Sequence, residues 1–309
     1  VLALWRLYRL MRRRRYAVVH TNSSKAGVLG RWAAWLARTP VIVHTVHGWG
    51  HNDRQHPLVR AYYILVEKMT LPITDKLIVV SPLDIEKGLR DGIGTCDDYV
   101  VIRSSVDLEH LKHPAAPRET TRAALGIPLD APVVGSVTRL SPQKAPLDFV
   151  RSAAAVHAER PDVWFVMVGD GPQRAEVEAL AKELGIRDQL VLTGLRRDVP
   201  ELLAAFDLFV LSSLWEGLPR VIIQAMASGL PVVATAADGT AEAVGQGVNG
   251  FLTPPGDPDA LAGMVLQVLN NPELARTMGA AGLERVEEFS DRHMVALTDT
   301  LYRELLTKS

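Results

Sequence analysis

Short apolar runs rich in β-branched residues alternate with amphipathic helical patterns along nearly the whole chain. Ten runs have the length and composition of buried strands, and they lie at 16–21, 41–45, 76–80, 99–102, 133–138, 164–169, 190–193, 208–211, 231–235 and 250–253. Helical patterns lie between most of them, at 27–37, 57–71, 82–89, 146–159, 174–184, 199–204, 219–227 and 258–269. This alternation predicts an α/β protein whose parallel sheets are covered by helices on both faces.

A polar, proline-containing segment at 107–130 interrupts the alternation and has no strand pattern. A fresh strand–loop–helix pattern begins after it, at Val133. We therefore interpret the segment as a linker and expect two Rossmann-like domains, over 1–112 and 113–290. A last helical pattern at 291–309 has apolar residues at helical spacing, which favours docking on a domain surface.

The composition of the chain argues against several classes of function and structure. The 309 residues have a formal net charge of -1 and a pI near 6.8, so no overall basic field indicates a nucleic-acid partner. The single cysteine, Cys96, cannot form an internal disulfide and fits a reducing cytosol. No apolar run reaches the ~20 residues that a membrane-spanning helix needs.

The segment 212–235 carries an acidic residue, Glu216, between a strand pattern and a helix pattern. This order predicts that the N–H groups of Gly217 and Leu218 lie at a helix N-terminus, which suits a phosphate. A carboxylate beside a phosphate is costly unless it binds something else, such as sugar hydroxyls. Gln224, a little over two helical turns later, can project to the same side. Alternatively, Glu216 is a helix-start acid and Gln224 faces solvent.

Two other loops follow strands in the same half of the chain. Arg139 and Lys144 follow the run at 133–138, and two such cations can clamp a diphosphate. Gly169 and Gly171 end the next run and permit close approach of a ligand. Taken singly, the loop with Arg139 and Lys144 could be an ordinary solvated loop, and the segment with Gly169 and Gly171 could be a tight turn. Because the carboxyl ends of parallel strands meet at one edge, the three loops together favour a pocket for a phosphate-bearing sugar.

Histidines mark a strand end in the first half. His47 follows the apolar run at 41–45, where a general base or a polar ligand contact would lie, whereas His44 lies inside the run and reads as a core residue. His44, His47 and His51 share no helical face, which argues against zinc. No Asp-x-Asp pair follows an apolar strand, which argues against a divalent metal. We therefore expect no metal.

One further anion site is suggested in the first half. Ser23, Ser24 and Lys25 follow the run at 16–21 and start a helix, an arrangement that can bind an anion. The alternative is a serine N-cap beside an exposed lysine.

The opening helical pattern carries six arginines, Arg6, Arg9 and 12–15. Such a basic amphipathic helix can lie on an anionic membrane surface. Alternatively, the arginines form a solvated face and the apolar stripe packs on the domain.

Five motifs together resemble glycosyltransferase family 4, the retaining sugar-nucleotide transferases with the GT-B fold. They are HTNSSKAGVLGRWAA, HTVHGWG, VGSVTRLSPQKAPLDF, VMVGDGP and EGLPRVIIQAMASGLPVVAT. The first two look most like those of bacterial enzymes of capsule, exopolysaccharide or O-antigen assembly. The resemblance implies two Rossmann-like domains facing across a cleft, a UDP-sugar donor and an acceptor saccharide on a polyprenyl diphosphate lipid. It also implies a cytoplasmic protein at the inner face of the cytoplasmic membrane, and a final helix at 291–309 that crosses back to the first domain.

The resemblance assigns roles to individual residues. Arg139 and Lys144 would hold the donor diphosphate and its developing charge without a metal. Glu216 would bind hydroxyls of the donor sugar, and His47 would contact that sugar near the reacting centre. Further donor contacts are expected at Gly169, Gly171, Gly217, Leu218 and Gln224. The acceptor side is expected at Ser23, Ser24 and Lys25.

The chain departs from the family pattern in two ways. Gln224 stands where the family has a ribose-binding glutamate, and its amide oxygen can still accept a hydroxyl proton. The family's opening strand, Gly-rich loop and helix have no counterpart before Val1, so we expect a truncated first domain. Two alternatives to a transferase follow: a remnant that binds a sugar nucleotide without transfer, and a nucleotide-sugar epimerase. The epimerase would need more carboxylates in the crevice.

Overall fold

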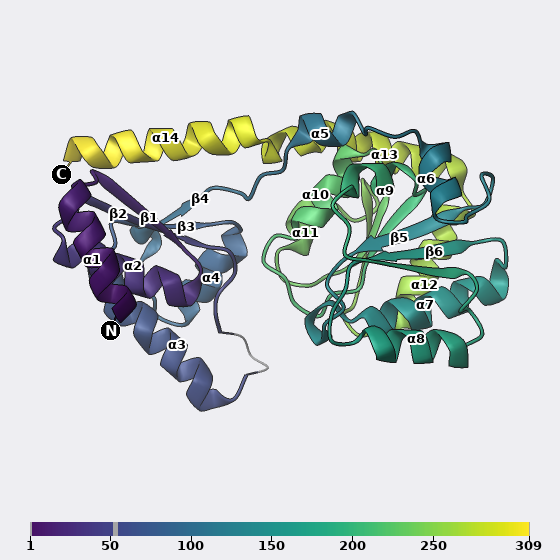
Figure 1. Cartoon of the computed structure of the whole chain (residues 1–309), viewed down its shortest axis with the longest axis horizontal. Helices are drawn as coiled ribbons and strands as arrows, with labels where there is room; N and C mark the ends of the chain where they lie inside the picture. Colours follow the sequence, from purple (N-terminus) through teal and green to yellow (C-terminus); the bar gives the residue numbers. More distant parts are fainter. Residues whose placement is uncertain (1, 52–54, 309) are drawn as a thin grey trace. The chain divides into compact units, whose positions relative to one another are not determined.

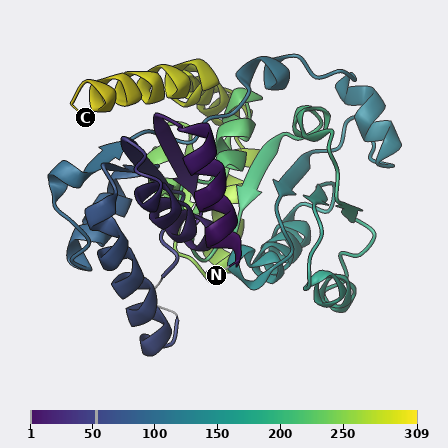
Figure 2. The same cartoon turned by 60° about the vertical axis from the view of Figure 1, so that its left-hand side comes forward.

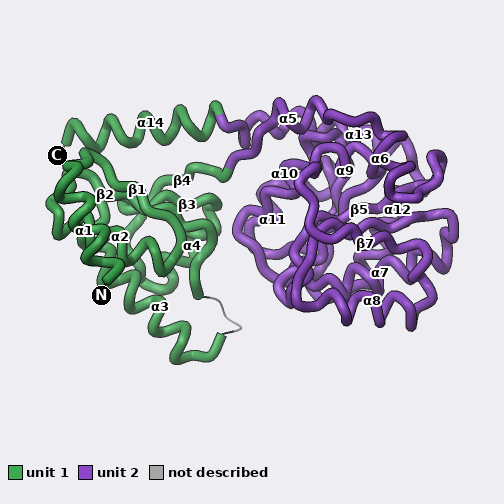
Figure 3. The backbone as a smooth tube through the Cα atoms, in the orientation of Figure 1, with its two compact units in different colours: residues 1–104, 292–309 green, residues 105–291 purple. Residues whose placement is uncertain are grey.

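The computed structural model describes residues 2–51 and 55–308, which form two compact units (Figure 3). Unit 1 comprises residues 1–104 and 292–309, and unit 2 comprises residues 105–291. The boundary therefore precedes the polar segment 107–130 and does not lie within it. No helix among the described residues is long and apolar enough to cross a membrane.

Unit 1 is a four-stranded parallel sheet in the order β1-β2-β3-β4. Its strands are β1 (Val18–Asn22), β2 (Val41–Val46), β3 (Lys76–Val79) and β4 (Tyr99–Val101). Its helices are α1 (Leu2–Arg14), α2 (Ser24–Leu36), α3 (Pro57–Thr70), α4 (Pro82–Arg90) and most of α14 (Asp291–Lys308), with short 3-10 turns at Leu71–Ile73 and Cys96–Asp98.

The alternation of side chains along these strands sorts the helices onto two faces. Val41, Val43 and Ile78 point to one face and pack with Leu301 of α14. Leu77 and its neighbours on the other face pack with apolar residues of α3 and α4, and a further cluster there joins α1 and α2. Both cartoon views show α14 along one face and the remaining helices on the other (Figures 1 and 2).

Unit 2 is a six-stranded parallel sheet in the order β10-β9-β8-β5-β6-β7. Its strands are β5 (Val133–Val137), β6 (Trp164–Val168), β7 (Leu190–Gly194), β8 (Leu208–Leu211), β9 (Val232–Thr235) and β10 (Gly250–Thr253). Its helices are α5 (Leu108–Lys112), α6 (Arg118–Ala124), α7 (Pro146–Glu159), α8 (Arg174–Glu183), α9 (Val199–Ala204), α10 (Arg220–Ala227), α11 (Thr240–Ala243), α12 (Pro258–Leu269) and α13 (Pro272–Arg285), with 3-10 turns at Pro142–Lys144 and Val286–Phe289.

This strand order is doubly wound. The chain starts the sheet at β5, extends it through β6 and β7, then returns to the other side of β5 with β8. The sheet thus has a switch point between β5 and β8, where connecting loops leave in opposite directions. Ligands of open α/β sheets bind at such a point, outside the carboxyl ends of the strands.

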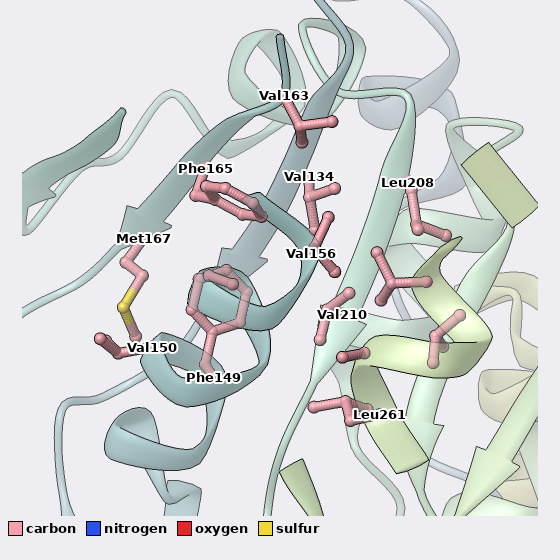
Figure 4. Close-up of a cluster of buried hydrophobic side chains, with 14 of the residues drawn as sticks. Val134, Phe149, Val150, Val156, Val163, Phe165, Met167, Leu208, Val210 and Leu261 are labelled. Carbon is pink, nitrogen blue, oxygen red and sulfur yellow. The ribbon is translucent and has the colours of Figure 1, made fainter. Parts of the chain in front are cut away.

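A close-packed core holds the strands of unit 2 in place (Figure 4). Phe149 of α7 meets Phe165 of β6 edge to face, with ring centroids 6.5 Å apart. Val134, Leu208 and Leu261 join them and are buried. Burying each such side chain contributes roughly 1.5–3 kcal/mol, so the strand ends that carry the candidate site rest on a rigid support.

The structure contains all ten predicted strands but corrects the reading of 107–130 as a linker. This segment forms α5 and α6, which belong to unit 2. Arg118 and Arg122 of α6 both make ion pairs with Asp207, and Arg122 is buried. Polar residues that suggested a solvated linker therefore attach α6 to the residue before β8.

Candidate functional site

The loops that follow β5 and β8 are tied to each other at the switch point. The amide of Leu214 donates to the carbonyl of Gln143 at 2.8 Å. The side chain of Gln143 donates back to the carbonyl of Trp215 at 3.0 Å. The hydroxyl of Ser212 donates to the carbonyl of Lys144 at 3.0 Å. These bonds hold the two predicted site segments together at the expected edge of the sheet.

Lys144 and Glu216 meet in this arrangement. The Nζ atom of Lys144 makes an ion pair with Oε1 of Glu216, which also accepts a hydrogen bond from the Ser213 hydroxyl at 2.5 Å. The Glu216 side chain is only 6 % exposed, and that of Lys144 is 21 % exposed. The Glu216 amide donates to Oδ2 of Asp238 at 3.0 Å. An ammonium and a carboxylate, both largely withdrawn from water, are thus held at the switch point.

Arg139 and Gln224 have unengaged side chains in the same unit. Arg139 is exposed, and its guanidinium has no partner among residues 2–51 and 55–308. Gln224 is half-buried on α10, and its side-chain amide likewise bonds to none of the described residues. Both are therefore available to a ligand, but their roles remain predictions.

The helix after Glu216 begins within one residue of its predicted start at 219. It starts at Arg220 behind Pro219, so Gly217 and Leu218 lie in the preceding loop and not in the first helical turn. Their amides donate to no acceptor in the described part of the chain. Pro219 occupies the N-cap position of this helix and has no N–H to donate. The two free amides can still meet a phosphate, as loop donors.

Gly169 and Gly171 have a packing role. Gly169 adopts a φ of +133°, and a Cβ there would lie 1.9 Å from the carbonyl oxygen of Thr138. A Cβ on Gly171 would lie 2.3 Å from the carbonyl oxygen of Leu140. The loop after β6 thus presses backbone to backbone on the loop after β5. Close approach of a ligand at these glycines remains a prediction.

Unit 1 has a pocket at the carboxyl ends of β1 and β2. Its volume is about 210 Å³. Its polar and aromatic lining comprises Ser23, Ser24, His44, Thr45, His47, Trp49 and Glu67. The structure therefore brings Ser23, Ser24 and His47 together. Lys25 is exposed on the first turn of α2 and does not line the pocket.

The start of α2 matches the capping alternative in position but not in hydrogen bonding. Ser23 occupies the N-cap position, but its side chain makes no capping hydrogen bond. Its φ of 62° and ψ of 149° lie in a region that residues other than glycine rarely adopt. The hydroxyl is thus not used as a cap, and the strained residue lies at the pocket.

Histidines beside this pocket are held neutral. His44 is buried, bonds through Nδ1 to the Thr21 hydroxyl at 2.9 Å and has its pKa lowered to about 3 by desolvation and by the charge of Arg31. His20 has its pKa lowered by burial and by His47. His44 is thus the core histidine that its position predicts. Exposed His47 bonds through Nε2 to Oδ1 of Asn22 at 3.0 Å.

The structure adds residues that sequence reasoning missed. Ser213 and Asp238 contact Glu216 in unit 2, and Asn22 contacts His47 in unit 1. Asp238 follows β9 at its carboxyl end, so the strand-end rule that selected Glu216 could have found it. Among the described residues, no three His, Cys, Asp or Glu side chains are grouped so that they could hold a metal ion.

Family models match nearly the whole chain. The model described as "Glycosyltransferase Family 4" matches residues 1–110, and the model described as "Glycosyl transferases group 1" matches residues 117–285. The two matched regions meet close to the boundary between the compact units.

Curated relatives and solved structures also match over most of the chain. A UDP-Gal:alpha-D-GlcNAc-diphosphoundecaprenol alpha-1,3-galactosyltransferase from Escherichia coli is 34% identical, over 87% of this chain and 70% of its own length. A 2-deoxystreptamine glucosyltransferase from Streptomyces kanamyceticus is 32% identical, over 82% and 66%. The crystal structure of Anabaena Alr3699/HepE in complex with UDP and glucose has a TM-score of 0.87 at 26% identity, covering 98% of this chain and 81% of that one.

Proposed function

The chain belongs to glycosyltransferase family 4, with the GT-B fold and a nucleotide-sugar donor, and from this premise we propose its specific reaction. It transfers a hexose or N-acetylhexosamine from a UDP-sugar to a saccharide on a polyprenyl diphosphate lipid. The anomeric configuration is retained, and the product is used for a cell-surface polysaccharide. The observation that carries this proposal is the Lys144–Glu216 pair at the switch point of unit 2.

The donor chemistry follows from the charges at that point. The bond between the anomeric carbon and the β-phosphate oxygen breaks, and its electron pair leaves with UDP. Lys144 and Arg139 stabilise the charge that develops on the diphosphate, and the free amides of Gly217 and Leu218 donate to its oxygens. These groups supply the positive charge that the step needs, so we propose that it requires no metal. Glu216 accepts hydrogen bonds from the donor sugar hydroxyls.

The acceptor side is proposed for unit 1. Ser23, Ser24 and Lys25 hold the acceptor, and His47 contacts the donor sugar. An acceptor hydroxyl bonds to the anomeric carbon and its proton leaves with UDP. The name of the Escherichia coli relative, which specifies a diphosphoundecaprenol-linked acceptor, supports a lipid-linked substrate. An acceptor of this kind resides in a membrane, so we propose a cytoplasmic protein attached peripherally to the inner face, with the arginines of α1 at the lipid surface.

A transfer assay tests the proposal. The chain is incubated with each of a panel of UDP-hexoses and UDP-N-acetylhexosamines, with and without a short-chain polyprenyl diphosphate GlcNAc acceptor. We expect a glycosylated lipid with one donor, in the presence of EDTA, and NMR of the product should show the donor's anomeric configuration. UDP-sugar binding without transfer indicates the binding remnant. Conversion of the sugar without acceptor indicates an epimerase. Either outcome contradicts the proposal.

A further inference from the structure

Helix α3 presents several large apolar side chains to solvent. Five large apolar side chains of this helix are exposed: Leu58 by 75%, Val59 by 45%, Tyr62 by 62%, Leu65 by 56% and Met69 by 59%. Their spacing places them on one side of the helix, and we call them the α3 stripe. Helices on a protein surface normally show the reverse pattern, with apolar residues facing the core.

Ion pairs fix this orientation. Glu67 of α3 lies on the inner side, where its carboxylate is 2.7 Å from the buried guanidinium of Arg31. Arg60 pairs with Asp91 at 2.5 Å. Rotating α3 to bury the stripe would break both pairs. It would also leave the fully buried guanidinium of Arg31 without its carboxylate partner, at a high cost in free energy. The outward position of the stripe is therefore built into unit 1.

Apolar exposure continues onto the neighbouring helix. On α2, Trp35 is 50% exposed and Leu36 is 47% exposed. The two helices are joined by the indole N–H of Trp32, which donates to the Thr70 hydroxyl at 3.3 Å. Figure 1 shows α1, α2 and α3 together on the side of the sheet opposite α14. Aromatic residues with a polar atom, such as Trp35 and Tyr62, are favoured at membrane–water interfaces.

The charge of this part of the chain identifies the partner. The first seventy residues contain 12 arginines and lysines but only 2 acidic residues, whereas the whole chain has 34 and 35. One of those two acids, Glu67, already neutralises Arg31. A second copy of the chain would therefore bring two regions with an excess of basic residues together, which is unfavourable. An anionic surface fits instead.

We propose that the α3 stripe inserts into the headgroup region of an anionic lipid bilayer, with the arginines of α1, a helix on the same side of the sheet, at the lipid phosphates. Apolar side chains then leave water while cations meet anionic lipid, the two contributions that hold amphipathic helices at interfaces. The inference deepens the proposed function and rests on it only for the location of the acceptor. It makes α3, and not α1 alone, the element that contacts lipid.

Vesicle flotation tests the inference with the full chain. Vesicles of phosphatidylcholine alone and with one third phosphatidylglycerol are compared. The test variant replaces Leu58, Tyr62 and Leu65 with glutamine, and a control variant replaces three apolar residues exposed on unit 2, Leu195→Gln, Val248→Gln and Leu129→Gln. We expect the wild type and the control to float with the anionic vesicles. The partition coefficient of the α3 variant should fall at least ten-fold while its circular dichroism and affinity for UDP stay unchanged.

Three outcomes overturn the inference. The first is that the α3 variant floats like the control, and the second is that the wild type does not bind anionic vesicles. The third is that the wild type forms a concentration-dependent dimer that the α3 substitutions dissociate. The proposed function is tested separately with a water-soluble short-chain acceptor. Transfer to that acceptor should be equal in the wild type and the α3 variant, and transfer to a polyprenyl acceptor embedded in vesicles should be lowered in the variant. Loss of transfer to both acceptors in the wild type would contradict the proposed function alone.

Discussion

Replacing Lys144 by methionine tests two contributions of the Lys144–Glu216 pair, one to the stability of unit 2 and one to UDP binding. Methionine keeps much of the length and the apolar stem of lysine but removes the charge. In the variant, the Glu216 carboxylate is 6 % exposed and keeps the Ser213 hydroxyl as its side-chain donor. A buried carboxylate that has lost its cation is destabilising, so the free energy of unfolding should fall.

The size of the effect follows from the burial. Removing one partner of a buried ion pair costs about 3–5 kcal/mol. The Lys144 side chain is 21 % exposed, so part of its attraction to Glu216 is already screened and the lower end, about 3 kcal/mol, applies. For a domain of the size of unit 2, each kcal/mol lowers Tm by about 2–4 °C, which gives a fall of about 6–12 °C. UDP affinity should fall more than ten-fold, or about 1.4 kcal/mol.

A second substitution distinguishes the two effects. Adding Glu216→Gln to Lys144→Met removes the unpaired charge, so Tm should recover most of its loss, whereas UDP binding should stay weak. Scanning calorimetry and titration calorimetry measure these quantities, with Lys182→Met, an exposed lysine of the same unit, as the control. If Lys144→Met matches Lys182→Met in Tm, the pair does not stabilise the fold. If it matches in UDP affinity, the donor site lies elsewhere.

Four other substitutions or conditions test individual features. Arg139→Ala should weaken UDP binding more than ten-fold without lowering Tm, because the side chain is exposed and unpaired within the described residues, and titration with unchanged affinity would contradict its role. Gln224→Glu should keep or tighten UDP binding, and a marked loss in the same titration would refute the ribose contact. Gly169→Ala should lower Tm by several degrees in calorimetry, because its Cβ would clash with the backbone of Thr138, and an unchanged Tm would refute that contact. Because the pKa of His44 is lowered to about 3 from 6.5, the unfolded chain binds more protons between these values. The free energy of unfolding in urea should therefore fall as pH drops below 6.5, by up to about 1.4 kcal/mol per unit, and His44→Gln should reduce that slope.

The strands and the candidate residues at their carboxyl ends could be predicted because each depends on local sequence. Buried parallel strands read as continuous apolar runs, and all ten were found. Glu216 and Lys144 were selected as residues that follow such runs, and parallel strands bring their carboxyl ends to one edge. The pair itself was not predicted, since it depends on the order β8-β5, which places two loops side by side that are distant in sequence.

The parts that failed depend on partners far along the chain. The polar composition of 107–130 indicated a linker, but Arg118 and Arg122 find their shared carboxylate at Asp207. No residue near the two arginines in the sequence indicates that Asp207 is their partner. Ser23 does occupy the N-cap position, but its hydroxyl makes no capping hydrogen bond, because the backbone geometry there, and not residue preference alone, decides whether it can cap.

Helix α3 shows the limit of periodicity most clearly. A 3.6-residue period reveals that a helix has an apolar side, but the period is the same whether that side faces the core or the solvent. The ordinary assumption points large apolar residues inward, and for the residues of the α3 stripe that assumption is wrong. The direction is decided by Glu67 and Arg60, whose partners Arg31 and Asp91 lie on other elements. The orientation of α3 is thus decided by charged residues that face inward and pair with residues distant in the sequence. An exposed apolar surface of this kind usually marks a site that binds a protein or a membrane.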